Sequence, residues 1–143
     1  MHIAPLSTDD RAPWELLARG YKEFYKTPTS DEEFETAWNR LLGRDGILGL
    51  GAKVDGRLVG IAHYLFHTTT WAPKICYLQD LFTAQDVRGQ GVGRALIEAV
   101  YERAKTAGAG RVYWHTHETN TVARRLYDKV ADLSGFIVYR KQP

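Results

Sequence analysis

Three glycines between residues 89 and 93 stand where chemistry can be expected, at the change from a strand-like run to a helix-like one. Gly89, Gly91 and Gly93 follow an apolar run that ends near Phe82, and they open an amphipathic stretch. The first N–H groups of a helix have no partner within the helix and lie at the positive end of its dipole. This arrangement predicts a site for an anion, most often a phosphate.

The spacing of these glycines excludes two common phosphate-binding motifs. The dinucleotide fingerprint G-x-G-x-x-G fails in both registers, because its third glycine would fall on Arg94 or Leu96. The P-loop fails because no glycine in the chain is followed by lysine. The remaining string, Arg88-x-x-Gly91-x-Gly93 at a helix start, resembles the pyrophosphate-binding signature of the GNAT acetyltransferase superfamily.

The resemblance implies acetyl-coenzyme A as cosubstrate and assigns two backbone segments to it. Pyrophosphate is expected on the N–H groups of Gly89, Gln90, Gly91, Val92, Gly93 and Arg94. The side chains of Arg88 and Arg94 either add positive charge there or face solvent. The end of the preceding strand is expected to pair with the pantetheine amides through Leu81, Phe82 and Thr83.

A second motif places a tyrosine near the reacting sulfur. Asn120-x-x-Ala123-x-x-Leu126-Tyr127 resembles the superfamily motif N-x-x-A-x-x-L-Y. The resemblance implies that Tyr127 protonates the leaving thiolate, and general acid help of this kind is worth roughly 10²–10⁴ in rate. The alternative is a core tyrosine on an amphipathic helix. Asn120 is either a helix N-cap, a cofactor contact, or both.

The general base is less clearly marked. Some relatives carry a glutamate one residue before an aspartate on the fourth strand, and here that pair reads Gln79-Asp80. Gln79 cannot take a proton, so Asp80 is the candidate base, directly or through water. Asp80 could instead bond backbone or orient a turn. Glu118 and a water chain without a named base remain alternatives.

Other reactive residues receive structural interpretations. His115 and His117 alternate on a strand, but structural zinc sites usually need four ligands, often with cysteine, so no metal site is predicted. Cys76, the only cysteine, is expected to be a buried strand residue, which fits a reducing cytoplasm. The acidic residues at positions 31–35 suit a helix start, and the resemblance implies that this helix helps to wall the acceptor site.

Periodicity and turn signals predict ten elements along the chain. Strands are expected at residues 1–6, 47–54, 57–69, 75–82, 111–115 and 136–139. Helices are expected at residues 10–26, 30–42, 91–107 and 120–130. The capping box Ser30/Glu33 marks the second helix, and Asp55-Gly56 marks a hairpin. This order predicts an α/β (α+β) fold with a mixed, mostly antiparallel sheet and helices on both faces, which also resembles the GNAT fold.

Composition limits the remaining possibilities. A chain of 143 residues with 44% apolar residues fits one domain, residues 1–143, with a core. A net charge of +2 gives no footprint for nucleic acid, and no apolar run approaches the roughly 20 residues of a membrane span. The N-terminus carries no secretory signal pattern, so a cytoplasmic protein is expected.

The sequence therefore predicts an acetyl-coenzyme A-dependent N-acetyltransferase that acts directly on a primary amine. It is most similar to bacterial relatives of the histone- and polyamine-type enzymes, through the segments 77–82 and 126–130. The acceptor could be a polyamine, an amino acid, an aminoglycoside or a protein lysine. A homodimer is possible, since superfamily members often pair through C-terminal elements. The alternative function is a non-catalytic acyl-coenzyme A binding or sensing domain.

Overall fold

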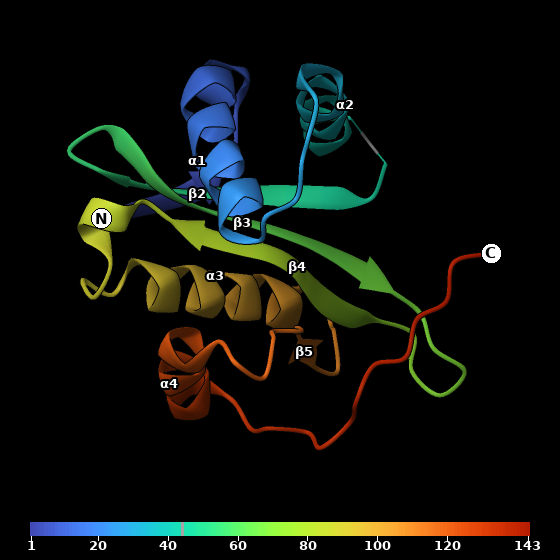
Figure 1. The fold of residues 1–143 in the computed structure, drawn as a ribbon. Helices are drawn as coiled ribbons and strands as arrows, with labels where there is room; N and C mark the ends of the chain where they lie inside the picture. Colours follow the sequence, from blue (N-terminus) through green and yellow to red (C-terminus); the bar gives the residue numbers. More distant parts are fainter. Residues whose placement is uncertain (44) are drawn as a thin grey trace.

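One five-stranded sheet runs through the whole computed structural model, which describes residues 1–43 and 45–143 (Figure 1). The strands lie in sequence order: β1 (His2–Pro5), β2 (Ile47–Val54), β3 (Arg57–His67), β4 (Ile75–Thr83) and β5 (Val112–Tyr113). The first four pair antiparallel, and β5 pairs parallel to β4. The mixed, mostly antiparallel sheet expected from the sequence is thus confirmed.

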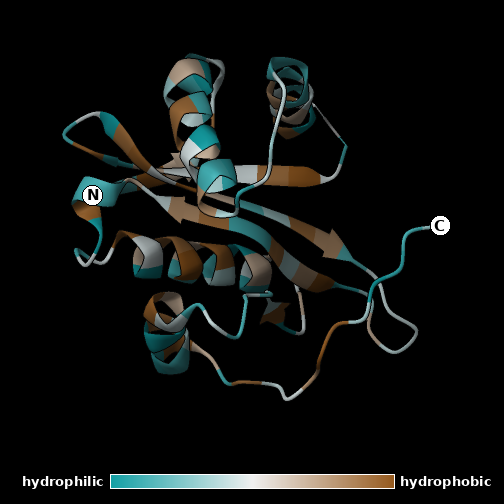
Figure 2. Ribbon diagram, in the orientation of Figure 1, coloured by the Kyte–Doolittle hydropathy of each residue, from teal (hydrophilic) through white to brown (hydrophobic). Residues whose placement is uncertain are grey.

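Helices cover both faces of this sheet. On one face lie α1 (Arg11–Phe24) and α2 (Asp31–Leu42), and on the other lie α3 (Val92–Thr106) and α4 (Thr121–Val130) (Figure 1). Two short 3₁₀ turns, Thr8–Asp10 and Gln85–Val87, lead into α1 and α3. Apolar residues concentrate along the central strands between the two helical layers (Figure 2). None of the described helices is long and apolar enough to cross a membrane.

The hairpin turn and the capping box predicted from the sequence are both present in the structure. Asp55 and Gly56 both have positive φ, 49° and 79°, as a two-residue hairpin turn between right-twisted strands requires. At the start of α2, the Ser30 side chain accepts from the Glu33 N–H and the Glu33 carboxylate accepts from the Ser30 N–H. Both signals depend only on neighbouring residues, which is why sequence alone located them.

The core joins α1, α2 and α3 to the sheet. Trp14 stacks on Trp38 with ring centroids 5.1 Å apart, so the two helices of one face meet above β3. On the other face α3 approaches β3 at Gly60, where a Cβ would lie 2.8 Å from Val92 and 2.9 Å from Leu96. Only glycine admits this approach, which holds the first turn of α3 close to the sheet.

The predicted final strand at 136–139 is wrong for this structure. Residues 131–143 contain no strand, and their large apolar side chains are exposed, Phe136 by 90% and Tyr139 by 88%. A strand exists only where a neighbouring edge pairs with it. No described strand pairs with this segment, although its composition favours a strand.

Candidate functional site

The glycine turn between β4 and α3 presents bare backbone donors. Gly89 and Gly91 have φ of +81° and +83°, a conformation that favours glycine, and Gly91 is the N-cap of α3. The hydrogen bonds of the helix begin where the Ala95 N–H donates to the Gly91 carbonyl, 3.0 Å away. The N–H groups of Val92, Gly93 and Arg94 therefore precede the helical ladder, as an anion site requires.

Side chains brace this turn from outside. Arg57 forms two bonds to the Asp86 carboxylate, at 2.6 and 2.9 Å, and Gln90 Nε2 donates to the Asp86 carbonyl at 3.2 Å. Arg94 pairs with Glu98 at 2.8 Å on the helix surface, and the Arg88 guanidinium lies 5.4 Å from the centre of the Phe82 ring. The side chain of Gln90 thus supports the turn, and Arg94 already has an anionic partner.

β4 has an open edge next to this turn. It pairs with β5 only at Cys76–Val112 and Tyr77–Tyr113, although β4 continues to Thr83. The Ala84 N–H donates to the Val59 carbonyl of β3, and alternate residues of a strand direct their backbone groups to opposite edges. Phe82 therefore faces β3, whereas Leu81 and Thr83 leave backbone N–H and C=O groups at the open edge.

A β-bulge brings Asp80 to the face of α1 and α2. β3 and β4 pair His63 with Asp80 and Tyr64 with Leu78, so Gln79 is an extra residue. In a regular strand Leu78 and Asp80 would point the same way, but the bulge reverses the alternation. Leu78 thus shares the side of Tyr64, beside Arg103 of α3, while Asp80 joins His63 on the other side.

Asp80 is held by side chains rather than by backbone. His63 Nδ1 lies 2.9 Å from Asp80 Oδ2, and Tyr21 also donates to this carboxylate. Burial raises the pKa of Asp80, but the hydrogen bond from His63, the charge that His63 carries when protonated, the Tyr21 hydroxyl and the charge of Lys22 lower it, and the net pKa lies below the ordinary value. Asp80 is therefore ionised at neutral pH, with its side chain 25% exposed.

Sequence reasoning missed His63, although a signal was present. A single histidine in the apolar run Ile61-Ala62-His63-Tyr64 predicts a buried polar ring, which must find hydrogen-bond partners. Its partners are Asp80 and the Trp14 indole, whose Nε1 lies 2.9 Å from His63 Nε2. The His63 side chain is 11% exposed.

Asp80 lines a pocket of about 250 Å³ between the sheet and the first two helices. Its lining is mixed aromatic and charged: Trp14, Ala18, Tyr21, Lys22, Thr29, Glu33, Phe34, Ala37, Arg40, Ile61, His63, Asp80 and Phe82. The pocket therefore carries both signs of charge close to a partly buried carboxylate. A ligand with an amine and an anionic group fits that description.

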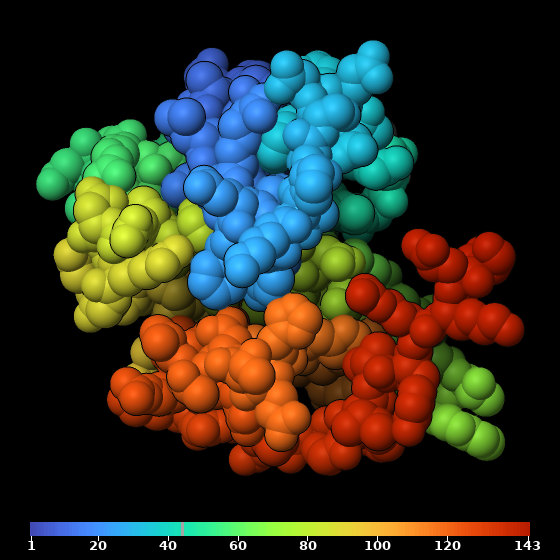
Figure 3. Space-filling model, viewed as in Figure 1, coloured from blue at the N-terminus to red at the C-terminus, as the bar shows by residue number. Residues whose placement is uncertain are grey.

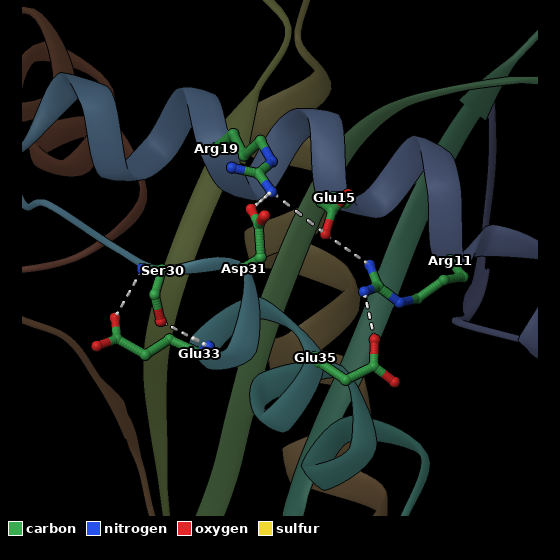
Figure 4. Close-up of polar contacts among 7 residues, drawn as sticks. All are labelled: Arg11, Glu15, Arg19, Ser30, Asp31, Glu33 and Glu35. Carbon is green, nitrogen blue, oxygen red and sulfur yellow. Dashed lines mark hydrogen bonds and ion pairs between the residues drawn. The ribbon is translucent and has the colours of Figure 1, made fainter.

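Ion pairs tie the two helical walls of the pocket together (Figure 4). Arg11 pairs with Glu35 at 2.7 Å, and Arg19 pairs with Asp31 at 2.6 Å. These contacts occupy two of the four acidic residues near the start of α2, and Glu33 closes the capping box. The acidic cluster is thus mainly structural, and Glu33 is its only member that lines the pocket.

Tyr127 lies on α4, across the open edge of β4 from these groups. Its ring packs edge-on against Trp114 with centroids 5.4 Å apart, and burial raises the pKa of the phenol from 10.0 to about 12. The hydroxyl therefore carries its proton at neutral pH, as a general acid must. Asn120 caps the same helix: its Oδ1 accepts from the Ala123 N–H at 3.5 Å and its Nδ2 donates to Thr116 at 3.2 Å.

The other candidates lie elsewhere. Glu118 and Gln79 are exposed and do not line the pocket. His115 contacts the Tyr77 hydroxyl at 3.3 Å, and His117 stacks near Tyr25. Within residues 1–43 and 45–143, no group of three or more His, Cys, Asp or Glu side chains is arranged to hold a metal.

Comparisons with known proteins agree on one family. The profile described as the acetyltransferase (GNAT) family matches residues 12–132. D-amino-acid N-acetyltransferase HPA3 of Saccharomyces cerevisiae is 34% identical over 144 residues, covering 97% of this chain and 89% of that protein. Thialysine N-epsilon-acetyltransferase of Bos taurus is 33% identical over 116 residues, covering 81% and 68%.

Solved structures show the same fold. The aminoglycoside N-acetyltransferase AAC(6′)-Iy, in complex with the bisubstrate analogue CoA-S-monomethyl-acetylneamine, aligns with a TM-score of 0.86 at 16% identity. The alignment covers 99% of this chain and 97% of that one.

Replacing Gly93 by alanine separates anion binding from folding. Gly93 lacks a positive φ, and a Cβ there would lie 3.5 Å from Leu126 and 3.9 Å from Thr83, ordinary contact distances. Gly93→Ala should therefore fold with near wild-type thermal stability, yet bind acetyl-coenzyme A at least tenfold more weakly by calorimetry, because the methyl group lies beside the bare N–H groups. Gly110→Ala, whose Cβ would meet its nearest atom, on Ile75, at the ordinary contact distance of 3.9 Å, is the matched control. Unchanged affinity in folded Gly93→Ala would contradict the phosphate assignment.

Proposed function

Because this chain belongs to the acetyltransferase (GNAT) family, we propose that it acetylates the primary amine of a small α-amino acid held in the pocket between α1, α2 and the sheet. Family membership makes the protein an N-acetyltransferase that uses acetyl-coenzyme A. The predicted membership of the GNAT superfamily is thus confirmed, and the finer likeness to bacterial histone- and polyamine-type members stays a prediction.

The charged residues of the pocket are the reason for proposing an α-amino acid as the acetyl acceptor. Asp80 lies on the sheet beneath the pocket, and Lys22 and Arg40 line it from α1 and α2. Among the described residues, neither Lys22 nor Arg40 forms an ion pair, so both remain available for a substrate carboxylate. An α-amino acid carries the complementary pair of charges. The activity named for the yeast relative, on D-amino acids, supports the same class.

Each residue of the site has a proposed task. Acetyl-coenzyme A, when bound, supplies an acetyl thioester. We assign its pyrophosphate to the turn at residues 89–94 and its pantetheine amides to the open edge of β4 at Leu81 and Thr83. Asp80 accepts the proton of the ammonium group, and Tyr127 holds a proton at its hydroxyl for the departing sulfur. The N–H groups at the β4 edge orient and polarise the acetyl carbonyl.

The alternative of a non-catalytic acyl-coenzyme A binding domain loses its main support. That alternative came from Gln79, which stands where some relatives carry a glutamate. Gln79 is the exposed, bulged residue of β4, and the carboxylate that reaches the pocket is Asp80.

A cytoplasmic location, proposed from the single reduced Cys76, would be tested by fractionation of cells that express the native protein.

Tyr127→Phe tests the acid. The ring and its contact with Trp114 remain, and only the hydroxyl is lost. We expect kcat to fall roughly ten- to a thousandfold, while acetyl-coenzyme A affinity changes little, because the interaction is made in the transition state. The measurement is release of free thiol under conditions in which chemistry limits the rate. Tyr101→Phe, an exposed tyrosine on α3, is the control. A wild-type kcat in Tyr127→Phe would contradict the acid role and leave Tyr127 a packing residue.

Lys22→Met and Arg40→Met test recognition of the carboxylate. With an α-amino acid, KM should rise tenfold or more for each variant, because a charged hydrogen bond is lost. With the methyl ester of the same amino acid, KM should be the same in variant and wild type. Arg19→Met, which removes a cation paired with Asp31 and absent from the pocket lining, controls for loss of charge. Equal changes for acid and ester would contradict an α-amino acid as acceptor.

We also propose a homodimer formed through the C-terminal segment, residues 131–143. This segment runs past β5 as a separate limb at the edge of the molecule (Figure 3). A run of exposed apolar side chains of this kind is unusual for a monomer: Leu133, Phe136, Ile137, Val138 and Tyr139. Among the described strands, none pairs with the outer edge of β5. If each copy added its residues 136–139 as a strand to β5 of the other copy, the exposed apolar side chains would be buried and the β5 edge would be paired in both copies.

Light scattering of the full chain tests this dimer. Wild type should have twice the mass of one chain, and the double variant Phe136→Asp/Ile137→Asp should shift to the mass of one chain, because charge cannot be buried in the added strand. Gln142→Asp, in the same segment but outside the apolar run, should remain dimeric. A monomeric wild type, or a dimer that survives the double substitution, would contradict the proposal.

A further inference from the structure

A chain of hydrogen bonds runs from the core to the pocket carboxylate. Trp14 on α1 is 1% exposed, and its Nε1 lies 2.9 Å from Nε2 of His63 on β3. Nδ1 of His63 lies 2.9 Å from Oδ2 of Asp80 on β4. Three elements far apart in sequence thus supply one line of contacts that ends at the proposed base.

The chemistry of the indole fixes the direction of this chain. An indole nitrogen can only donate, so His63 Nε2 must accept and carries no proton. The proton of the ring then sits on Nδ1 and is donated to Asp80. A doubly protonated ring would set two N–H groups against each other at 2.9 Å inside the core. The contact with Trp14 therefore favours the neutral ring with its proton on Nδ1.

We propose that His63, oriented by Trp14, is a positioning residue that fixes the Asp80 carboxylate as the acceptor of the substrate's ammonium proton. The proposal rests on the proposed role of Asp80. A carboxylate has about four acceptor positions, so the bond from His63 anchors Oδ2 and leaves capacity for an ammonium N–H. Because His63 Nε2 is occupied by Trp14, the imidazole itself is not available as the base.

A neutral donor suits this task better than a cation. The groups that face Asp80 are Tyr21 and Lys22 from α1, Tyr25 directly after α1, His63 from β3 and Tyr77 from β4 itself. Lys22 is the only fixed positive charge among them. A neutral His63 therefore orients the carboxylate without cancelling the negative charge that attracts the ammonium group. Loss of its hydrogen bond should raise the Asp80 pKa, because that bond favours the ionised form.

Nuclear magnetic resonance of the full chain tests the relay without any substrate. The ¹⁵N signals of His63 should report a neutral ring protonated on Nδ1 at pH 7. The ¹³C signal of the Asp80 carboxyl should titrate at higher pH in His63→Leu than in wild type. His63→Asn, whose amide can still donate to Asp80, should restore part of the shift. Trp14→Phe should mix the His63 tautomers, whereas Trp38→Phe, which trims the neighbouring indole of the same stack, should not.

Kinetics supply the second measurement. In His63→Leu, kcat/KM should fall roughly ten- to a hundredfold, because a misplaced group loses about that much rate, and its acidic limb should move to higher pH. A loss of stability alone would leave that limb in place. His63→Asn should recover part of the rate, and Trp14→Phe keeps the test available if His63→Leu does not fold.

Two results separate the relay from the assignment of the base. If Asp80→Asn keeps wild-type turnover, the proposed base is wrong, and the proposed purpose of the relay is overturned with it. If Asp80→Asn is inactive but His63→Leu leaves both the Asp80 titration and the acidic limb unchanged, only the relay is overturned. A His63 ring protonated on Nε2 at pH 7 would also overturn it.

Discussion

One extra residue in β4 decides which side of the sheet carries the pocket carboxylate. Without the bulge at Gln79, Asp80 would point to the side of Leu78 and α3, into packed apolar side chains. With it, Asp80 meets His63 and Tyr21 beneath the two helices of the other face. The pocket, the relay from Trp14 and the proposed acceptor site all depend on this reversal of the side-chain alternation.

The polar side chains within the sheet are held by hydrogen bonds. A buried imidazole is costly unless both nitrogens are satisfied, and here each has one partner at 2.9 Å. No buried side-chain polar atom among the described residues lacks a hydrogen bond. Satisfied networks of this kind hold side chains in a single arrangement, and a base that must meet a substrate amine needs such an arrangement.

Features set by neighbouring residues were predictable from the sequence. The hairpin at Asp55-Gly56, the cap at Ser30 and the helix start after Gly91 each follow from the conformations of a few adjacent residues. The bulge was not predictable, because Gln79-Asp80 reads equally well as a regular strand and only the pairing with β3 shows the extra residue. The same limit applies to residues 136–139, whose composition favours a strand but which pair with none of the described strands. His63 was visible as a lone polar residue in an apolar run, but its partners lie 49 residues before it and 17 after it.

Because β4 separates from β5, the part of the site that holds Asp80 and the part that holds Tyr127 differ in stiffness. Asp80 lies on β4, paired to β3, and is anchored to the core through His63 and Trp14. Tyr127 lies on α4, which buries no residue completely and joins the sheet through a strand of two residues. Local opening is least costly where few apolar contacts are buried. The proposed base thus lies in a well-packed strand and the proposed acid on a helix with no fully buried residue, so we expect bound molecules to exchange by movement of α4 while Asp80 stays in place.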